Sequence, residues 1–351
     1  MANILDIRRR IRSVVNTRQI TKAMKTVSAA KLRRAQESAL AARPYSQMLT
    51  NVLKSLVGRA EIYDSVTGQP LHPLLTEREE KTILLGVVTG DKGLAGAFNT
   101  NILKMAMKFI ESKPDQDIDI VCIGRKGRDF MRRRFPLAPS SQPEAEIALP
   151  RAGRIQIVAE HVGVLGKLEY SFADTLSRNV IEAYGRSEID GFYILFNEFK
   201  SVIAQRLVAE RVLPMRAIGT VDITLAEEAT QEERKQRLEA AKTAGVGVRP
   251  ADTHAVDEAA SGFGAANVDY IYEQPPSQLF EGILPKYIGT QVFRALLESV
   301  AAEHAARMTA MDAATSNASD MIESLTLIMN RARQAKITKE IIEIVSGAAA
   351  Q

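Results

Sequence analysis

The far end of the chain repeats apolar residues at alternating intervals of three and four. Residues 286–346 contain no proline, and Gly289 is their only glycine. This spacing is typical of a coiled-coil seam rather than of a helix lying on a globular core. As one helix the stretch would span roughly 90 Å, so it needs a second helix along its length. The predicted seam is Met311, Ala314, Ala318, Met321, Leu325, Ile328, Ala332 and Ala335.

The beginning of the chain shows the same pattern. Residues 3–57 contain no glycine and one proline, Pro44. Because proline removes an intrahelical hydrogen bond, the pattern predicts a second long helix that bends or kinks near Pro44. The two ends of the chain are the obvious partners, most simply as an antiparallel pair. The three-four spacing of the apolar line is interrupted at Arg18 and resumes at Ile20. The line comprises Ile4, Ile7, Ile11, Val14, Ile20, Met24, Val27, Leu32, Ala35 and Ala39.

Between these helices, short apolar runs alternate with helical patterns. Continuous β-branched runs are typical of strands buried on both faces, and their alternation with helices indicates an α/β domain with a partly parallel sheet. The fold class is therefore α/β, with a small Rossmann-like domain attached to a long antiparallel coiled coil. The predicted strands are Thr82–Val88, Asp117–Gly124, Ile155–Ala159, Gly191–Phe199 and Val202–Arg211, and the predicted helices are Thr100–Glu111, Lys126–Arg134 and Leu165–Tyr184.

The segment from 220 to 267 has a different composition. Thr230 and Glu233 form a capping-box pattern that predicts a charged helix ending near Ala244, before Gly245. The following residues to 266 hold too few apolar side chains for a core, which predicts a flexible, mobile or loosely docked insertion. Residues 268–272 return to strand character. The predicted organisation is an N-terminal helix (1–57), an α/β foot domain (58–277) with the 220–267 insertion, and a C-terminal helix (278–351).

The net charge of +4 is spread unevenly along the chain. Residues 1–44 carry eleven Lys and Arg against Asp6 and Glu37, a surplus of +9. Such a helix favours nucleic acid, an anionic membrane surface or an acidic protein as partner, with a solvated basic face as the alternative. No apolar run has the 18 or so residues of a membrane span, and the first ten residues do not resemble a signal peptide. A single cysteine, Cys122, fits a reducing compartment.

The sequence offers no case for catalysis, a cofactor or a metal site. The turn Gly90–Gly96 lies between a strand and a helix, but it lacks both the P-loop ending and the dinucleotide spacing, so a tight packing turn is favoured over a nucleotide site. The four histidines are isolated in sequence. Arg307 and His304 interrupt the apolar seam. Either the helix leaves its partner there, or these side chains set the register or face another protein.

Several long strings closely resemble the gamma subunit of F-type ATP synthase. They lie in both terminal helices and in the foot, and the resemblance covers nearly the whole chain except the insertion. The matching strings are residues 16–25 (NTRQITKAMK), 43–45 (RPY), 91–96 (DKGLAG), 305–317 (AARMTAMDAATSN), 330–340 (NRARQAKITKE) and 343–347 (EIVSG).

This resemblance implies a non-catalytic central rotor stalk. Its antiparallel coiled coil would turn inside a ring of three alpha and three beta subunits, and its foot would contact the epsilon subunit and the membrane-embedded c-ring. Proton flow would turn the stalk and drive the catalytic sites through different states. The implied location is the cytoplasmic face of the cell inner membrane, as a peripheral subunit that binds no nucleic acid. The alternative from the residues alone is a basic coiled-coil protein that binds nucleic acid or acts as a scaffold.

The resemblance also implies which residues contact the beta subunits. Met24 and Lys25 match a segment that faces an acidic loop of beta, and the tip 344–350 matches a part that enters an apolar sleeve. Further candidates are Arg9, Arg33 and Arg34 near the first site and Arg333, Gln334, Thr338 and Glu343 higher on the shaft.

Two departures from the family pattern affect regulation. Ala95 replaces a cysteine that many members have, and the insertion, at the position of a thiol-regulated insertion in the chloroplast form, contains no cysteine. We therefore expect no dithiol regulation, and we expect the capped helix to act as a mechanical brake.

Overall fold

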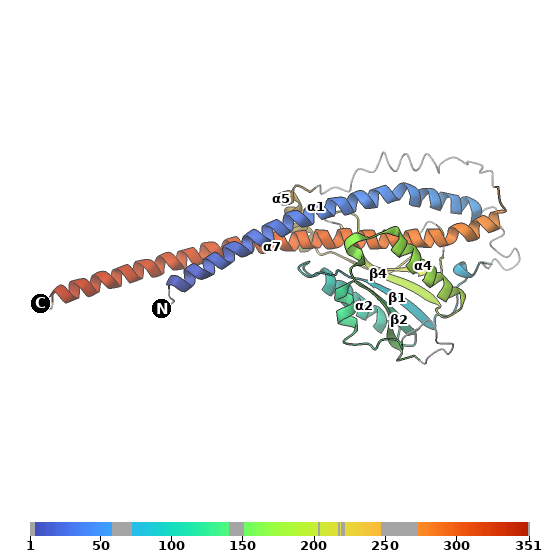
Figure 1. Ribbon diagram of the computed structural model, residues 1–351, viewed down its shortest axis with the longest axis horizontal. Coiled ribbons are helices and arrows are strands. Elements are labelled where there is room, and N and C mark those ends of the chain that lie inside the picture. Colours follow the sequence, from blue (N-terminus) through green and yellow to red (C-terminus); the bar gives the residue numbers. More distant parts are fainter. Residues whose placement is uncertain are drawn as a thin grey trace.

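Two long helices dominate the computed structural model. α1 (Ile4–Val57) and α7 (Pro276–Ala349) lie side by side, and an α/β domain packs along one part of them (Figure 1). The structure describes residues 4–57, 72–139, 151–202, 204–216, 218, 222–246 and 273–349. Residues 58–71, the segment 247–266 and the predicted strand 268–272 lie outside these ranges.

The two helices run antiparallel, as the sequence predicts. Thr21 of α1 contacts Thr315 of α7, whereas Lys25, one turn later in α1, contacts Asp312, one turn earlier in α7. α7 begins at Pro276, where the fixed backbone angle of proline suits a first helical turn, and it continues through Pro285. α1 also continues through Pro44, so this proline does not end the helix.

The foot domain contains one six-stranded sheet with the order β3-β2-β1-β4-β5-β6. β1 to β4 are parallel, and β5 and β6 add antiparallel strands at one edge, so the predicted partly parallel sheet is confirmed. β6 was not predicted, and it lies in the segment that the sequence assigns to the insertion. The strands are β1 (Thr82–Val88), β2 (Asp117–Ile123), β3 (Ile155–His161), β4 (Gly191–Phe199), β5 (Gln205–Leu213) and β6 (Asp222–Glu228).

The helices of the foot follow the predicted order. The segment expected as one helix from 165 to 184 is instead a short 3-10 helix and α4, because Leu168 between them is extended. α5 confirms the predicted capping box, since the Thr230 hydroxyl and the Glu233 carboxylate accept each other's backbone N–H, and it stops at Gly245. The helices are α2 (Phe98–Glu111), α3 (Arg125–Met131), α4 (Tyr170–Gly185) and α5 (Gln231–Ala244), with 3-10 helices at Pro73–Leu75 and Val164–Lys167.

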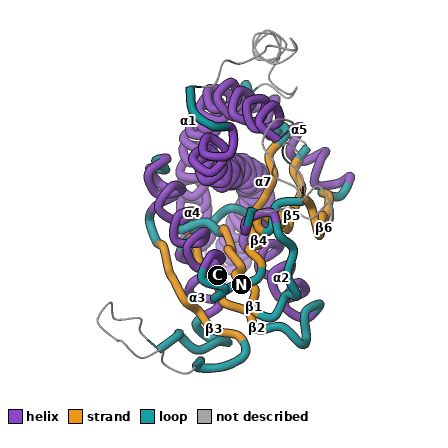
Figure 2. Tube along the Cα trace, turned by 90° about the vertical axis from the view of Figure 1, so that its right-hand side faces the viewer, coloured by secondary structure: helices purple, strands orange, loops and turns teal. Residues whose placement is uncertain are grey.

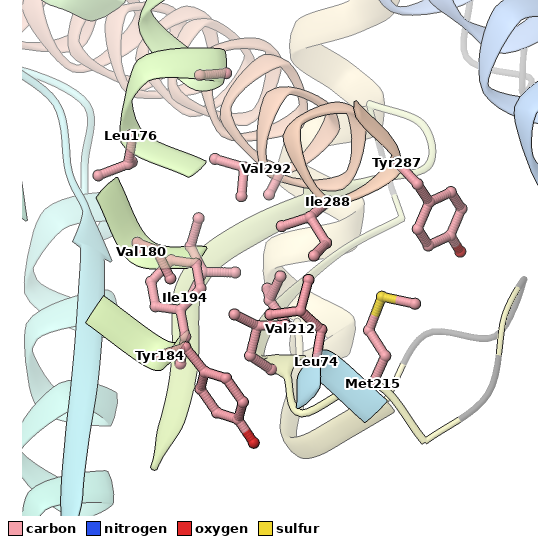
Figure 3. Packing of buried hydrophobic residues seen from close by; sticks show 14 of the residues in the cluster. Leu74, Leu176, Val180, Tyr184, Ile194, Val212, Met215, Tyr287, Ile288 and Val292 are labelled. Atoms are coloured by element: carbon pink, nitrogen blue, oxygen red, sulfur yellow. The ribbon is translucent and has the colours of Figure 1, made fainter. Parts of the chain in front are cut away.

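The two faces of the sheet bury separate cores. On one face, α2 packs its Ile102, Met105 and Phe109 against alternate residues of the strands. On the other face, α4, α7 and the end of α1 enclose a larger cluster, part of which Figure 3 shows between Val180 of α4 and Ile288 of α7. Figure 2, which looks along the long helices, shows them on the α4 side of the sheet. The first part of α7, from Phe280 to Leu296, is therefore held both by α1 and by the sheet.

Candidate functional site: the two-helix shaft

We call the paired parts of α1 and α7 the shaft. On α1, one heptad line faces α7 for the whole helix, and every member is buried or half-buried. The predicted slip at Arg18 does not occur, because the line continues through polar residues. Ile20 and Val27, which the sequence assigns to the seam, are 60% and 55% exposed. The observed line is Ile4, Ile7, Ile11, Val14, Arg18, Thr21, Lys25, Ser28, Leu32, Ala35, Ala39, Ala42, Ser46, Leu49, Leu53 and Leu56.

The facing line on α7 differs from the predicted seam at every second position. Both contain Met311, Ala318, Leu325 and Ala332, of which the first two are buried and the others half-buried. Ala314 is half-buried beside the seam, whereas Met321 and Ile328 are 53% and 46% exposed. Every second residue of the predicted line also belongs to the observed line, so the two fit the heptad spacing equally well. The sequence favoured the predicted line because it contains more apolar side chains. The observed line is Met308, Met311, Thr315, Ala318, Ile322, Leu325, Met329 and Ala332.

The end of α7 extends beyond the beginning of α1 (Figure 1). Ala335, the last residue of the predicted seam, is exposed on this free part. At 1.5 Å per residue, Arg333–Ala349 continues for about 25 Å. Several apolar side chains on the free part are exposed, namely Ile337, Ile341, Ile342, Ile344 and Val345.

The glycine turn of the foot contacts α7. The Arg307 guanidinium donates to the backbone oxygens of Lys92 and Gly93 at 3.4 and 3.3 Å and to the Glu303 carboxylate at 2.5 Å. A Cβ atom at Gly90 would lie 2.8 Å from the Glu303 carboxyl carbon, so glycine lets α7 approach here. The turn follows β1, and the order of the strands in the sheet reverses between β1 and β4. Open α/β sheets commonly bind their ligands at such a reversal. In this chain, α7 fills that position.

The polar interruption of the α7 seam is thereby explained. Arg307 is buried and serves the contact between shaft and foot, and His304 lies half-buried beside it. Burial and the neighbouring cation lower the pKa of His304 to about 4. The histidine is therefore neutral at physiological pH and adds no charge beside Arg307. Arg307 thus faces the foot domain of the same chain, and it lies outside the line that faces α1.

The predicted beta-contact residues are spread along the shaft. Met24 is half-buried, and Arg9 and Arg34 are exposed on α1. Lys25 differs, because its side chain points into the shaft and is only 13% exposed. Arg33 donates to the backbone oxygen of Gly245, at the end of α5. The predicted contact residues Arg333, Gln334 and Thr338 are exposed on the free part of α7. The side chain of Glu343 is outside the part that the structure describes.

The sequence predicts α5 but leaves open where this helix docks, and the structure places it on the shaft. Ala240 and Ala241 of α5 and Val246 after it pack against a cluster from both long helices that includes Leu32 and Met308. The only signal in the sequence is the pair of alanines followed by a valine after the glycine. This is too weak to indicate a docking surface, because the rest of α5 is charged.

Among the described residues, no three His, Cys, Asp or Glu side chains come together as metal ligands, and no helix is long and apolar enough to cross a bilayer. Cys122 lies fully buried in β2, and burial raises the pKa of its thiol to about 12. A thiol with that pKa is protonated at neutral pH, so Cys122 is a core residue.

The fold defines an elongated stalk protein, in which a two-helix shaft is seated on an α/β domain and continues past it as a single exposed helix. The family described as ATP synthase matches residues 3–351. An ATP synthase gamma chain of Solibacter usitatus is 45% identical over 350 residues, covering 100% of this chain and 99% of that protein. That of Trichlorobacter lovleyi is 42% identical, covering 99% and 98%. The chain therefore belongs to the ATP synthase gamma-chain family, and the resemblance seen in its sequence is confirmed.

A solved structure shares the fold at low sequence identity. A chain of the Euglena gracilis mitochondrial ATP synthase (OSCP/F1/c-ring) matches with a TM-score of 0.52 at 17% identity, covering 99% of this chain and 94% of that one. The predicted fold class, a long helical pair joined to an α/β domain, is confirmed.

Proposed function

We propose that this chain is the central rotor stalk of a proton-translocating ATP synthase. As a non-catalytic subunit, it transmits rotation of a membrane c-ring to the catalytic sites of a ring of three alpha and three beta subunits. The observation that carries the proposal is a family match over the whole chain, together with a shaft that extends beyond its own foot domain.

The surface of the shaft fits this role because it is unequal around its axis. A rotor changes the state of its neighbours only if it offers them different contacts at different angles. The exposed apolar side chains Ile20 and Val27 on α1 and Met321 and Ile328 on α7 lie outside the seam. Cationic residues are concentrated on α1, so turning the shaft changes both the charge and the apolar area that face a given neighbour.

We assign the contacts with the catalytic ring to positions along α1 and on the free part of α7. Met24 with Arg9, Arg33 and Arg34 forms the lower face toward an acidic part of beta, and Arg333, Gln334, Thr338 and Glu343 form the upper one. The apolar free end from Ile344 enters a sleeve formed by the ring. The foot contacts epsilon and the c-ring, which places the subunit peripherally at the cytoplasmic face of the inner membrane.

Rotation of the assembled complex tests the proposal. The chain is expressed with the alpha and beta subunits of its own complex, the ring is fixed to a surface, and a bead is attached through a cysteine at Glu111, which is exposed on α2. We expect ATP to turn the foot in one direction. A complex that assembles and hydrolyses ATP while the foot stays still would refute the rotor role.

A truncated chain that ends at Ala332 provides the matched comparison. It keeps the seam and removes only the single-helix end. Because the proposed upper contacts lie on the removed part, we expect this complex to rotate with lower torque at the same ATP concentration. Equal torque in both complexes would argue against the upper contacts.

A further inference from the structure

The seam of the shaft becomes polar near the middle of α1. From Arg18 to Ser28 the inward positions of α1 carry no apolar residue. The Thr315 hydroxyl of α7 donates to the Thr21 hydroxyl at 2.8 Å. Apolar side chains pack almost equally well after a slip of one turn, whereas polar groups at seam positions bond only in one alignment. The polar part of the seam therefore determines the register.

Lys25 lies at the centre of this polar part and joins three helices. Its Nζ atom donates to Asp312 Oδ1 of α7 at 2.5 Å and to Thr243 Oγ1 of α5 at 2.8 Å. The Thr243 hydroxyl lies 3.4 Å from both Asp312 carboxylate oxygens. The Lys25 and Asp312 side chains are 13% and 26% exposed, so this pair is shielded far more than an ordinary surface ion pair.

α5 provides that shielding and is itself attached on both sides of Thr243. Ala240 and Ala241 are fully buried against the shaft, and Val246 is almost fully buried. The Arg33 guanidinium donates to the Gly245 oxygen at 2.5 Å, at the negative end of the α5 dipole. α5 therefore covers the shaft where the ion pair crosses between α1 and α7.

We propose that Lys25, Asp312 and Thr243 are positioning residues that fix the register of α1 against α7, with α5 as a third helix of the shaft. A slip of α7 by one turn would move Lys25 from Asp312 to Met308 or Ser316, leaving a shielded ammonium without its carboxylate. Lys25 is then an internal tie between the helices and not a contact to the catalytic ring. Its effect on rotation rests on the proposed function, whereas its effect on register does not.

A disulfide across the seam measures the register in the full chain. Thr21→Cys and Thr315→Cys replace two side chains whose hydroxyls are 2.8 Å apart, and Cys122 is too deeply buried to compete. In this background, Lys25→Asp or Asp312→Lys places like charges together, and we expect the yield of intramolecular disulfide under mild oxidant to fall at least fivefold. The combined exchange, Lys25→Asp with Asp312→Lys, restores the opposite charges and the yield.

The control variant is Lys22→Asp, which makes the same charge change at an exposed position of α1 and leaves the disulfide yield unchanged. Thr243→Val removes one hydroxyl and lowers the yield two- to threefold, and Thr243→Ser restores it. Single charge reversals that keep the full yield, or an exchange that fails to recover it, would overturn the assignment.

The complex gives a second readout. Vesicles containing the whole ATP synthase are assayed for ATP hydrolysis and for ATP-driven proton uptake. We expect Lys25→Asp to lower proton uptake per ATP hydrolysed at least twofold and the charge exchange to restore it. Unchanged coupling in both variants would overturn the claim for rotation. A chain that does not assemble with alpha and beta subunits would contradict the proposed function, while the disulfide yield still decides the register.

Discussion

A buried carboxyl on α7 makes the attachment of the shaft to the foot sensitive to pH. Glu298 lies where α7 crosses β4 and β5, close to Glu198 and Glu210. Arg294 donates two hydrogen bonds to Glu210, at 2.8 and 2.6 Å, and lies 3.5 Å from Glu298. Within the described part of the chain, Glu298 Oε2 has no hydrogen-bond partner. Glu298 is thus the least compensated carboxylate of the three.

Burial raises the pKa of Glu298 from its ordinary 4.5 to about 7. Arg294 and the Phe199 backbone amide favour the ionised form, whereas Glu198 and Glu210 oppose it. Since the folded chain holds this proton after the unfolded chain has released it, the stabilisation is complete below pH 4.5 and is lost as pH rises through 7. A shift of that size corresponds to about 3 kcal/mol. The side chain is 17% exposed, so we expect roughly 1–3 kcal/mol after solvent screening.

Urea unfolding of the full chain at pH 5 and pH 8 measures this effect. Glu298→Gln keeps the shape of the side chain and removes its charge. From pH 5 to pH 8, we expect the free energy of unfolding of the variant to rise by roughly 1–3 kcal/mol relative to that of the parent. Glu323→Gln, an exposed position on the same helix, is the control and should show no gain. A Glu298→Gln variant whose difference from the parent is the same at both pH values would refute the reasoning.

Three further substitutions test the packing of the shaft and foot by thermal or urea unfolding. Arg307→Ala leaves the buried Glu303 carboxylate unpaired, so we expect a loss of about 3–5 kcal/mol, largely recovered by adding Glu303→Ala. Gly124→Ala would place a Cβ 1.9 Å from the Thr89 backbone oxygen at a φ of +103°, so we expect a loss of about 3 kcal/mol or more. Leu32→Ala empties a fully buried seam position and should cost about 2–5 kcal/mol.

Each of these substitutions has a control or a contradicting outcome. For the seam, Val27→Ala truncates an exposed side chain of the same helix and should change stability by less than about 0.5 kcal/mol. An equal loss of stability in Leu32→Ala and Val27→Ala would contradict the observed heptad line. Full stability of Gly124→Ala would contradict the close approach of Gly124 to Thr89. Full stability of Arg307→Ala would show that α7 is held without the ion pair between Arg307 and Glu303.

Much of the fold could be predicted because it depends on neighbours along the chain. The two glycine-poor ends predict long helices, and the β-branched runs predict β1, β2 and β4. The capping box predicts where α5 begins, and Gly245 predicts where it ends. These features arise from hydrogen bonds and side-chain periods over a few residues, which the sequence displays directly.

The placement of the candidate site was less predictable. Two lines of positions on α7 share every second residue, and the sequence favoured the one containing Met321 and Ile328, which are exposed. On α1, apolar Ile20 and Val27 were preferred to Thr21 and Ser28, which the fold buries. A choice based on side-chain polarity fails where a seam carries hydrogen-bonded polar residues.

The sequence by itself determined that the chain has two long helices, an α/β domain between them and a capped helix in its insertion, and it also determined the family. Only the tertiary structure decided which side of each long helix is the seam, where Arg307 is seated and what Lys25 contacts. The physical reason is that Lys25, Thr243 and Asp312 lie far apart in the chain. Their meeting depends on how three separate helices pack together, and no period within one helix records it.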